Sequence, residues 1–146
     1  MKPARPRPAR PAGYSGTPLP QKLGVKSGMT VALVSAPPGF SLGSLPPDAK
    51  LRRGARGRAD LVIWFVGSRT ALAWEIRRIV EYAAGAPLWI AWRKQTGPGA
   101  SRRAGITPPT EQTVRDAGLS AGLVDSKVCA IDPEWSGLRF TPRRSR

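Results

Sequence analysis

Two short polar segments of this sequence carry cations, and one of them lies at a predicted helix start. Cations and a helix N-terminus both favour the binding of anions. Ser68 and Arg69 follow the apolar run 61–66, and Arg93, Lys94 and Thr96 follow the apolar run 88–92. Arginine and lysine form charge-assisted hydrogen bonds with anions, and backbone N–H groups at a helix N-terminus point toward such a ligand. If both runs are parallel strands, these five residues lie at the carboxyl-end edge of one sheet. We therefore expect an anion-binding site there.

The chain lacks the groups that most enzymes use for acid–base or nucleophilic chemistry. It has no histidine and a single cysteine, Cys129, which excludes Ser-His-Asp and Cys-His arrangements, an ordinary zinc site and an internal disulfide. Asp60 lies at the amino end of its predicted strand, and Glu75 and Glu81 fall inside a predicted helix, so no general base is expected beside the anion site. Cys129 itself is expected to be a small buried hydrophobe. We predict no catalytic residue, no metal and no cofactor.

Alternating strands and helices are predicted to position these residues. Apolar and β-branched runs predict strands at 29–34, 60–66 and 88–92, with a short strand at 49–52 and a helical turn at 19–23. Ser68 is the predicted N-cap of a helix that stops at Gly85, and Thr110 caps a second helix that Gly122 ends. A strand, a helix and a strand within residues 61–92 predict a right-handed βαβ unit with parallel neighbouring strands.

The end of the chain predicts an antiparallel hairpin at an edge of the sheet. Runs 127–131 and 137–140 flank residues 132–135, where Asp followed by Pro favours a type I turn. Asp125 and Asp132 are expected to accept turn hydrogen bonds. Trp135 is a candidate contact for a partner or ligand, with packing over the hairpin as the alternative. The predicted fold class is α/β, a small Rossmann-like open sheet that is mostly parallel and ends in this hairpin.

Composition divides the chain into one domain with two basic ends. Residues 1–12 alternate basic residues with proline, which predicts a disordered arm, and residues 141–146 form a basic tail. Residues 13–140 are long enough for a single Rossmann-like domain with one core. The arm has no apolar segment typical of a signal peptide, and no run approaches the roughly 20 apolar residues that span a membrane. We expect a cytoplasmic protein.

The net charge of +15 favours anionic partners. The two ends hold seven of the 24 basic residues and none of the nine acidic ones, which leaves +8 on the body. Such a surface attracts nucleic acid through counterion release, and acidic proteins or small anions by simple attraction. An arginine-rich composition is also what a GC-rich genome produces without selection for binding, so charge alone does not choose among these partners.

Two segments resemble a known family. They are residues 13–35, GYSGTPLPQKLGVKSGMTVALVS, and residues 122–140, GLVDSKVCAIDPEWSGLRF, with ADLVIWFV and PLWIAWRK between them. Together they are similar to the DUF3052 family of uncharacterised, mainly actinobacterial proteins, a resemblance that implies no activity. More loosely, KLGVKSGMTVALV is similar to the segment that opens class I methyltransferases, which also end in an antiparallel hairpin.

The resemblance to methyltransferases implies the fold but departs at the cofactor site. Residues 35–38, Ser-Ala-Pro-Pro, stand where a glycine-rich loop would approach the cofactor, and two prolines there remove two backbone donors. No acidic residue occurs in residues 51–58, where the ribose hydroxyls would bind. We therefore favour a non-catalytic domain that binds an anionic ligand or an acidic protein partner. A divergent methyltransferase-like transferase and a nucleic-acid-binding protein that uses its basic tails remain alternatives.

Overall fold

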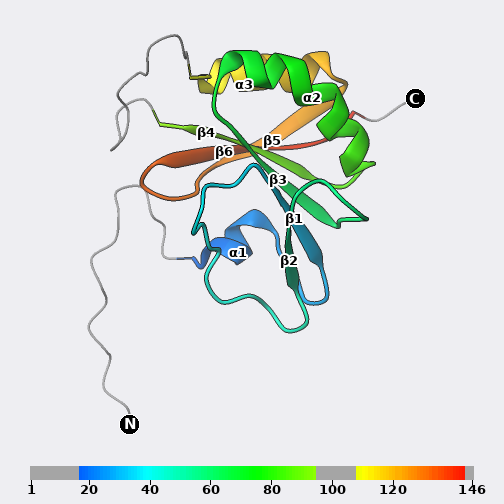
Figure 1. The fold of residues 1–146 in the computed structure, drawn as a ribbon, viewed down its shortest axis with the longest axis vertical. Helices are drawn as coiled ribbons and strands as arrows, with labels where there is room; N and C mark the ends of the chain where they lie inside the picture. Colours follow the sequence, from blue (N-terminus) through cyan, green and yellow to red (C-terminus); the bar gives the residue numbers. More distant parts are fainter. Residues whose placement is uncertain (1–16, 95–107, 144–146) are drawn as a thin grey trace.

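A computed structural model describes residues 17–94 and 108–143 of the chain. Its centre is a six-stranded sheet in the order β2-β1-β3-β4-β6-β5 (Figure 1). The predicted N-terminal arm, residues 1–12, lies outside the described residues, as do residues 144–146 of the predicted tail. The strands are β1 Thr30–Val34, β2 Lys50–Arg53, β3 Leu61–Val66, β4 Leu88–Arg93, β5 Leu123–Ala130 and β6 Trp135–Pro142; the helices are α1 Leu19–Leu23, α2 Arg69–Ala83 and α3 Glu111–Ser120.

The sheet is parallel over four strands and antiparallel over the rest. β1 pairs in parallel with β2 and with β3, and β3 pairs in parallel with β4. β6 lies between β4 and β5 and is antiparallel to both. These pairings confirm the predicted mostly parallel α/β sheet, the parallel neighbours at 61–66 and 88–92, and the C-terminal antiparallel hairpin.

Local sequence signals account for most of the elements. All six residues of β3 are buried, as expected for a strand with both faces covered. Ser68 Oγ accepts a hydrogen bond from the Ala71 N–H at 3.0 Å, and Thr110 Oγ1 accepts one from the Thr113 N–H at 3.1 Å. Both predicted N-caps are therefore confirmed. α1 ends at Gly24, whose φ of 89° is left-handed and favours glycine.

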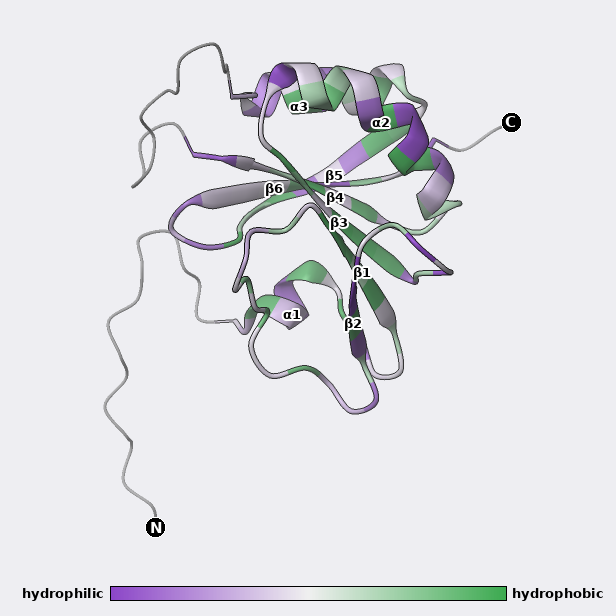
Figure 2. Cartoon of the chain, viewed as in Figure 1, coloured by the Kyte–Doolittle hydropathy of each residue, from purple (hydrophilic) through white to green (hydrophobic). Residues whose placement is uncertain are grey.

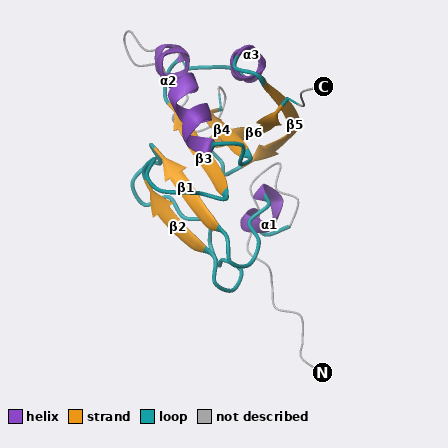
Figure 3. Ribbon diagram, turned by 90° about the vertical axis from the view of Figure 1, so that its right-hand side faces the viewer, coloured by secondary structure: helices purple, strands orange, loops and turns teal. Residues whose placement is uncertain are grey.

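Two apolar layers sandwich the sheet. On one face, α2 and α3 cover side chains that include Trp64, Leu72 and Phe140. On the other face, α1 and the connection between β1 and β2 cover side chains that include Phe65 and Trp89. Figure 3 shows α2 and α3 together on one side of the sheet and α1 on the other. None of the helices in the described part of the chain is long and apolar enough to cross a membrane.

Residues 35–49 connect β1 to β2 without a helix. Leu42 is 3% exposed, and the Phe40 ring meets the Phe65 ring edge-on with centroids 4.8 Å apart, so the connection packs onto the α1 face. At its base, Arg53 Nη2 donates to the Phe40 carbonyl at 3.1 Å. Buried apolar side chains of this loop therefore cover the face of the sheet that a crossover helix covers in most parallel sheets.

Residues 54–60 return from the carboxyl end of β2 to the amino end of β3, across the α2 face. Arg52 Nη2 donates to the Arg58 carbonyl at 2.9 Å and to Tyr82 Oη at 3.0 Å. The Tyr82 hydroxyl in turn donates to the Arg56 carbonyl at 3.1 Å. Hydrogen bonds from Arg52 of β2 and Tyr82 of α2 thus hold this return segment against the sheet.

The hairpin is longer than predicted. β5 begins at Leu123, four residues before the predicted start. Asp132 accepts turn hydrogen bonds, as expected, from the N–H groups of Glu134 and Trp135 at 2.7 and 2.8 Å. The expectation for Asp125 was wrong, because Asp125 lies inside β5 and its Oδ2 accepts from Arg115 Nε at 3.1 Å.

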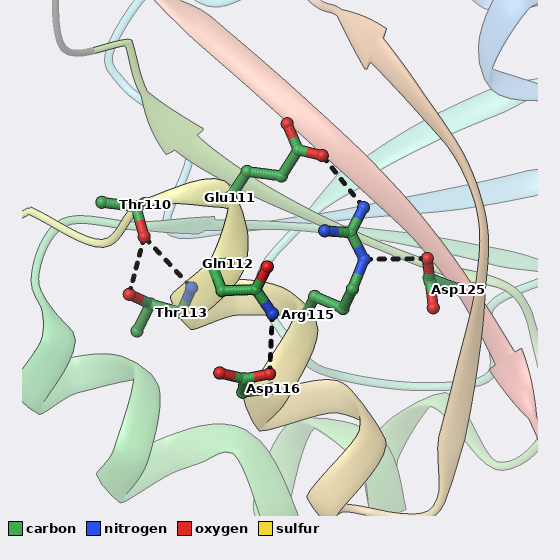
Figure 4. Close-up of polar contacts among 7 residues, drawn as sticks. All are labelled: Thr110, Glu111, Gln112, Thr113, Arg115, Asp116 and Asp125. Carbon is green, nitrogen blue, oxygen red and sulfur yellow. Dashed lines mark hydrogen bonds and ion pairs between the residues drawn. The ribbon is translucent and has the colours of Figure 1, made fainter.

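Arg115 links α3 to β5, as Figure 4 shows. Its guanidinium pairs with Glu111 at 2.9 Å and with Asp125 at 3.1 Å. Hydrogen bonds to Glu111 and then to Asp125 raise the pKa of Arg115 above its ordinary value. The guanidinium of Arg115 therefore favours its charged form in the folded protein, where it joins α3 to β5.

Candidate functional site

The sheet has a switch point between β1 and β3. From β1 the chain proceeds to β2 on one side, and from β3 it proceeds to β4 on the other. In open α/β sheets, ligands bind outside the carboxyl ends of the strands at such a point. Ser35 follows β1 there with a left-handed φ of 59° and an exposed side chain. This conformation costs a non-glycine residue on the order of 1 kcal/mol, so the backbone turns as a glycine would although no glycine is present.

The N-terminus of α2 opens beside the switch point. Ser68 uses its hydroxyl to cap the helix, whereas the N–H groups of Arg69 and Thr70 have no partner within the helix. The first turn of α2 holds no acidic residue, so nothing in that turn compensates the positive end of the helix dipole. The Arg69 side chain is exposed. This end of the sheet is therefore electropositive through both backbone and side chain.

Arg93, at the carboxyl end of β4, is held by the hairpin. Its Nη1 pairs with Glu134 Oε1 at 3.0 Å, and its guanidinium carbon lies 4.9 Å from the ring centroid of Trp135. The Lys94 N–H donates to the Glu134 carbonyl at 2.8 Å. Sequence reasoning missed Glu134 as a carboxylate at this edge. The register that pairs Arg93 with Trp135 brings it there, and only knowledge that β6 pairs with β4 could have revealed it.

The predicted site residues divide between the two faces of the sheet. Trp92 belongs to the core under α2, so its neighbour Arg93 takes the opposite face, where Trp135 lies. Lys94 follows the last residue of β4 and is partly buried. Thr96 lies outside the described residues. The structure thus brings Arg93 together with Trp135 on the face opposite α2, whereas Ser68 and Arg69 begin α2.

Trp135 is packed into the core. It is 6% exposed, and its ring meets Phe65 edge-on with centroids 5.1 Å apart. Phe65 also contacts Phe40, so three aromatic rings run in a row along this edge of the sheet. Arg93 lies over one end of the row, and Arg53 binds the Phe40 carbonyl at the other. Arg53 is a second residue that sequence analysis missed, because the predicted strand stopped one residue short of it.

The site contains no assembled metal centre. Within residues 17–94 and 108–143, no group of three or more His, Cys, Asp or Glu side chains could hold a metal ion. The chemistry available at the α2 end is that of hydrogen-bond donors and positive charge. Such groups bind an anion but do not remove a proton from a substrate.

Solved structures share the fold at low sequence identity. A SAM-dependent methyltransferase from Aquifex aeolicus matches with a TM-score of 0.56 and 15% identity, over 84% of this chain and 86% of that one. Magnesium protoporphyrin IX methyltransferase from Synechocystis PCC 6803, solved with bound SAH, matches with a TM-score of 0.50 and 12% identity, over 86% and 78%. The pyocyanin biosynthetic protein PhzM matches with a TM-score of 0.51 and 13% identity, over 85% and 53%.

These likenesses show that the chain has the Rossmann-like fold of SAM-dependent methyltransferases. No family model and no curated protein matches the chain, so the resemblance to the DUF3052 family stays a prediction. This fold carries many functions, so it does not by itself assign one to this chain.

Proposed function

We propose that this protein is a methyltransferase-like domain that binds a small anionic group at the N-terminus of α2 and catalyses no reaction. The observation that carries the proposal is the electropositive end of α2. There the Arg69 side chain and the N–H groups of Arg69 and Thr70, which have no partner within the helix, lie in a first turn without an acidic residue. Lys94 adds a second cation at the same edge of the sheet. A helix N-terminus with two cations attracts phosphate, sulfate or carboxylate groups.

The proposal that no reaction is catalysed rests on the position of the carboxylate at this edge of the sheet. Glu134 lies at the same edge of the sheet, but it is paired with Arg93 on the face away from α2. Its negative charge is engaged by that guanidinium, and it is poorly placed to accept a proton from a ligand at Arg69. The ligand is therefore bound rather than transformed.

Thermal unfolding in phosphate and in chloride at matched ionic strength tests the anion site. Phosphate at ten times its dissociation constant would stabilise the wild type by about 1.4 kcal/mol, a rise of a few degrees in Tm beyond the salt effect. The R69A/K94A double variant should lose this increment. The R93A variant is the matched control, because it removes a cation from the opposite face and should keep the increment while melting lower. An increment of equal size in wild type and R69A/K94A would overturn the proposal.

A methyltransferase-like transferase is the second candidate, favoured by the fold of the neighbours and by the SAH bound in one of them. The residues here do not fit that cofactor. Pro37 and Pro38 lack N–H groups in the loop after β1, and Arg53 ends β2, where an acidic residue would accept from the ribose hydroxyls. Isothermal titration calorimetry should detect no binding of S-adenosylmethionine. A dissociation constant below about 10 μM, roughly −7 kcal/mol, would make the transferase the leading candidate.

A further inference from the structure

Trp74 differs from the other four tryptophans in its exposure to solvent. Trp64, Trp89, Trp92 and Trp135 are between 0% and 6% exposed, whereas Trp74, on the outer side of α2, is 81% exposed. The core-facing residues of α2 are Leu72, Ile76, Ile79 and Ala83, so Trp74 contributes nothing to the packing of the helix. A large aromatic ring left in water is a characteristic anchor of binding surfaces.

Trp74 belongs to a row of aromatic and basic side chains along α2. Trp74, Arg78 and Tyr82 are spaced by four residues and therefore follow one another on the helix surface over about 12 Å. The side chain of Arg78 is 62% exposed, and its ion pair with Glu75 at 2.8 Å is open to solvent. An exposed pair of this kind is worth at most about 1 kcal/mol, so a phosphate can compete for Arg78.

The row continues into the basic segment around β2. The Tyr82 hydroxyl donates to the Arg56 carbonyl, which sets the end of the row against the return segment. Lys50, Arg56 and Arg58 are exposed there, and none pairs with a carboxylate in the part of the chain that the structure describes. Residues 50–58 contain no acidic residue at all. Figure 2 shows this hydrophilic segment beside the C-terminal end of α2.

A hollow opens where the row meets this segment. It has a volume of about 440 Å³ and is lined by Arg58, Asp60, Tyr82 and residues 83–86 among others. This volume lies within the range of small-ligand sites, about 300–1,000 Å³. We name the whole surface the α2 stripe, defined as Trp74, Arg78, Tyr82, Arg56, Arg58 and Lys50.

We infer that the α2 stripe binds single-stranded nucleic acid. Proteins that bind single strands combine cations that follow the phosphates with aromatic rings on which bases stack, and every base offers a face for stacking. Trp74 supplies the ring, the unpaired cations supply phosphate contacts, and the hollow beside Tyr82 can admit a base or a sugar. Glu81 lies beside Arg77 in a separate hollow between α2 and α3, which bounds the stripe on that side. This inference does not depend on the anion site at the N-terminus of α2.

Intrinsic fluorescence and fluorescence anisotropy of a labelled single strand test the inference on the full chain. Because the other tryptophans are buried, binding of oligo-dT should quench the emission of Trp74, and the W74F variant should lose the quenching. W74A should bind roughly 5- to 150-fold more weakly, the effect of losing one stacked base, and W74F should retain most of the affinity.

Matched double variants separate the stripe from the general positive charge. R56A/R58A removes two cations from the stripe, and K26A/K127A removes two exposed cations that lie elsewhere. The slope of log K against log salt concentration should fall by about 1.4 in R56A/R58A, because each lost phosphate contact contributes about 0.7 for a single strand. The K26A/K127A variant should keep the wild-type slope. The basic ends of the chain are present in every variant and cancel in the comparison.

Three outcomes would overturn the inference. The first is an absence of binding at low salt. The second is equal affinity and equal slope in R56A/R58A and K26A/K127A, which would assign binding to the ends of the chain. The third is binding of poly-glutamate with the same loss in W74A, which would assign the stripe to an acidic protein partner. Unchanged unfolding midpoints in these exposed-site variants would show that the fold is intact.

Discussion

Gly118 of α3 lies against the ring of Phe140 in β6, with no room between them for a methyl group. A Cβ atom on Gly118 would overlap the buried ring, which is 0% exposed. The helix therefore approaches the sheet more closely at this turn than any other residue type would allow. Gly118 sets the distance between α3 and β6.

Replacing Gly118 with alanine should destabilise the protein. Overpacking of a core costs typically about 1–3 kcal/mol, and the better helix propensity of alanine offsets about 1 kcal/mol of that. A Cβ atom here would overlap a buried ring, so we expect the cost at the upper end and a net loss approaching about 2 kcal/mol. The midpoint of urea unfolding measures it. G67A is the control, because Gly67 has open space around its Cβ position and should tolerate the same change without loss. Equal midpoints for the two variants would contradict the close approach.

Tyr82→Phe should loosen the return segment. The change leaves Arg52 and the Arg56 carbonyl each without one partner, at a cost of about 1 kcal/mol for a partly exposed group. Amide hydrogen exchange at residues 55–59 should accelerate, while exchange in β3 should not. Glu75→Gln serves as the comparison, because it breaks an exposed ion pair on the same helix and should leave those amides unchanged. Acceleration throughout the sheet would show that Tyr82 supports the core instead.

Asp132→Ala should weaken the hairpin. One carboxylate oxygen of Asp132 accepts from two backbone N–H groups, and its removal leaves both without that partner, which we expect to cost about 1–2 kcal/mol. The unfolding midpoint should fall, and the tryptophan emission should shift because Trp135 follows the turn directly. Asp132→Asn retains one oxygen acceptor and should recover part of the loss. An alanine variant as stable as wild type would mean that β-sheet pairing alone holds the turn.

Residue patterns within a single segment predicted the strands and helix starts that depend only on neighbouring residues. A strand covered on both faces must be apolar at every position, and 61–66 met that condition in the sequence. An N-cap needs one side chain with a nearby acceptor, which Ser68 and Thr110 supply. The apolar run that ends at Val34 likewise predicted the end of β1.

Contacts between distant segments could not be predicted in the same way. Arg52 and Tyr82 are 30 residues apart, and in the sequence Arg52 resembles every other arginine of a basic segment. Arg93 and Glu134 are 41 residues apart and meet only because β6 pairs with β4. The sequence of β4 does not show on which face of the sheet Arg93 lies, because a strand buried on both faces has no alternation of polar and apolar residues. The division of the candidate site between two faces therefore became visible only in the structure.

The position of β6 has a consequence for the order in which the protein can form during synthesis. β6, the last strand in the described part of the chain, pairs with β4 on one side and with β5 on the other. Translation proceeds at about 5–20 residues per second, so the apolar edge of β4 leaves the ribosome well before its partner exists. A nascent chain that pauses after β5 would present an unpaired apolar strand edge, which is a template for association with other chains. Only the final strand closes that edge, so the sheet cannot be completed before residues 135–142 have been made.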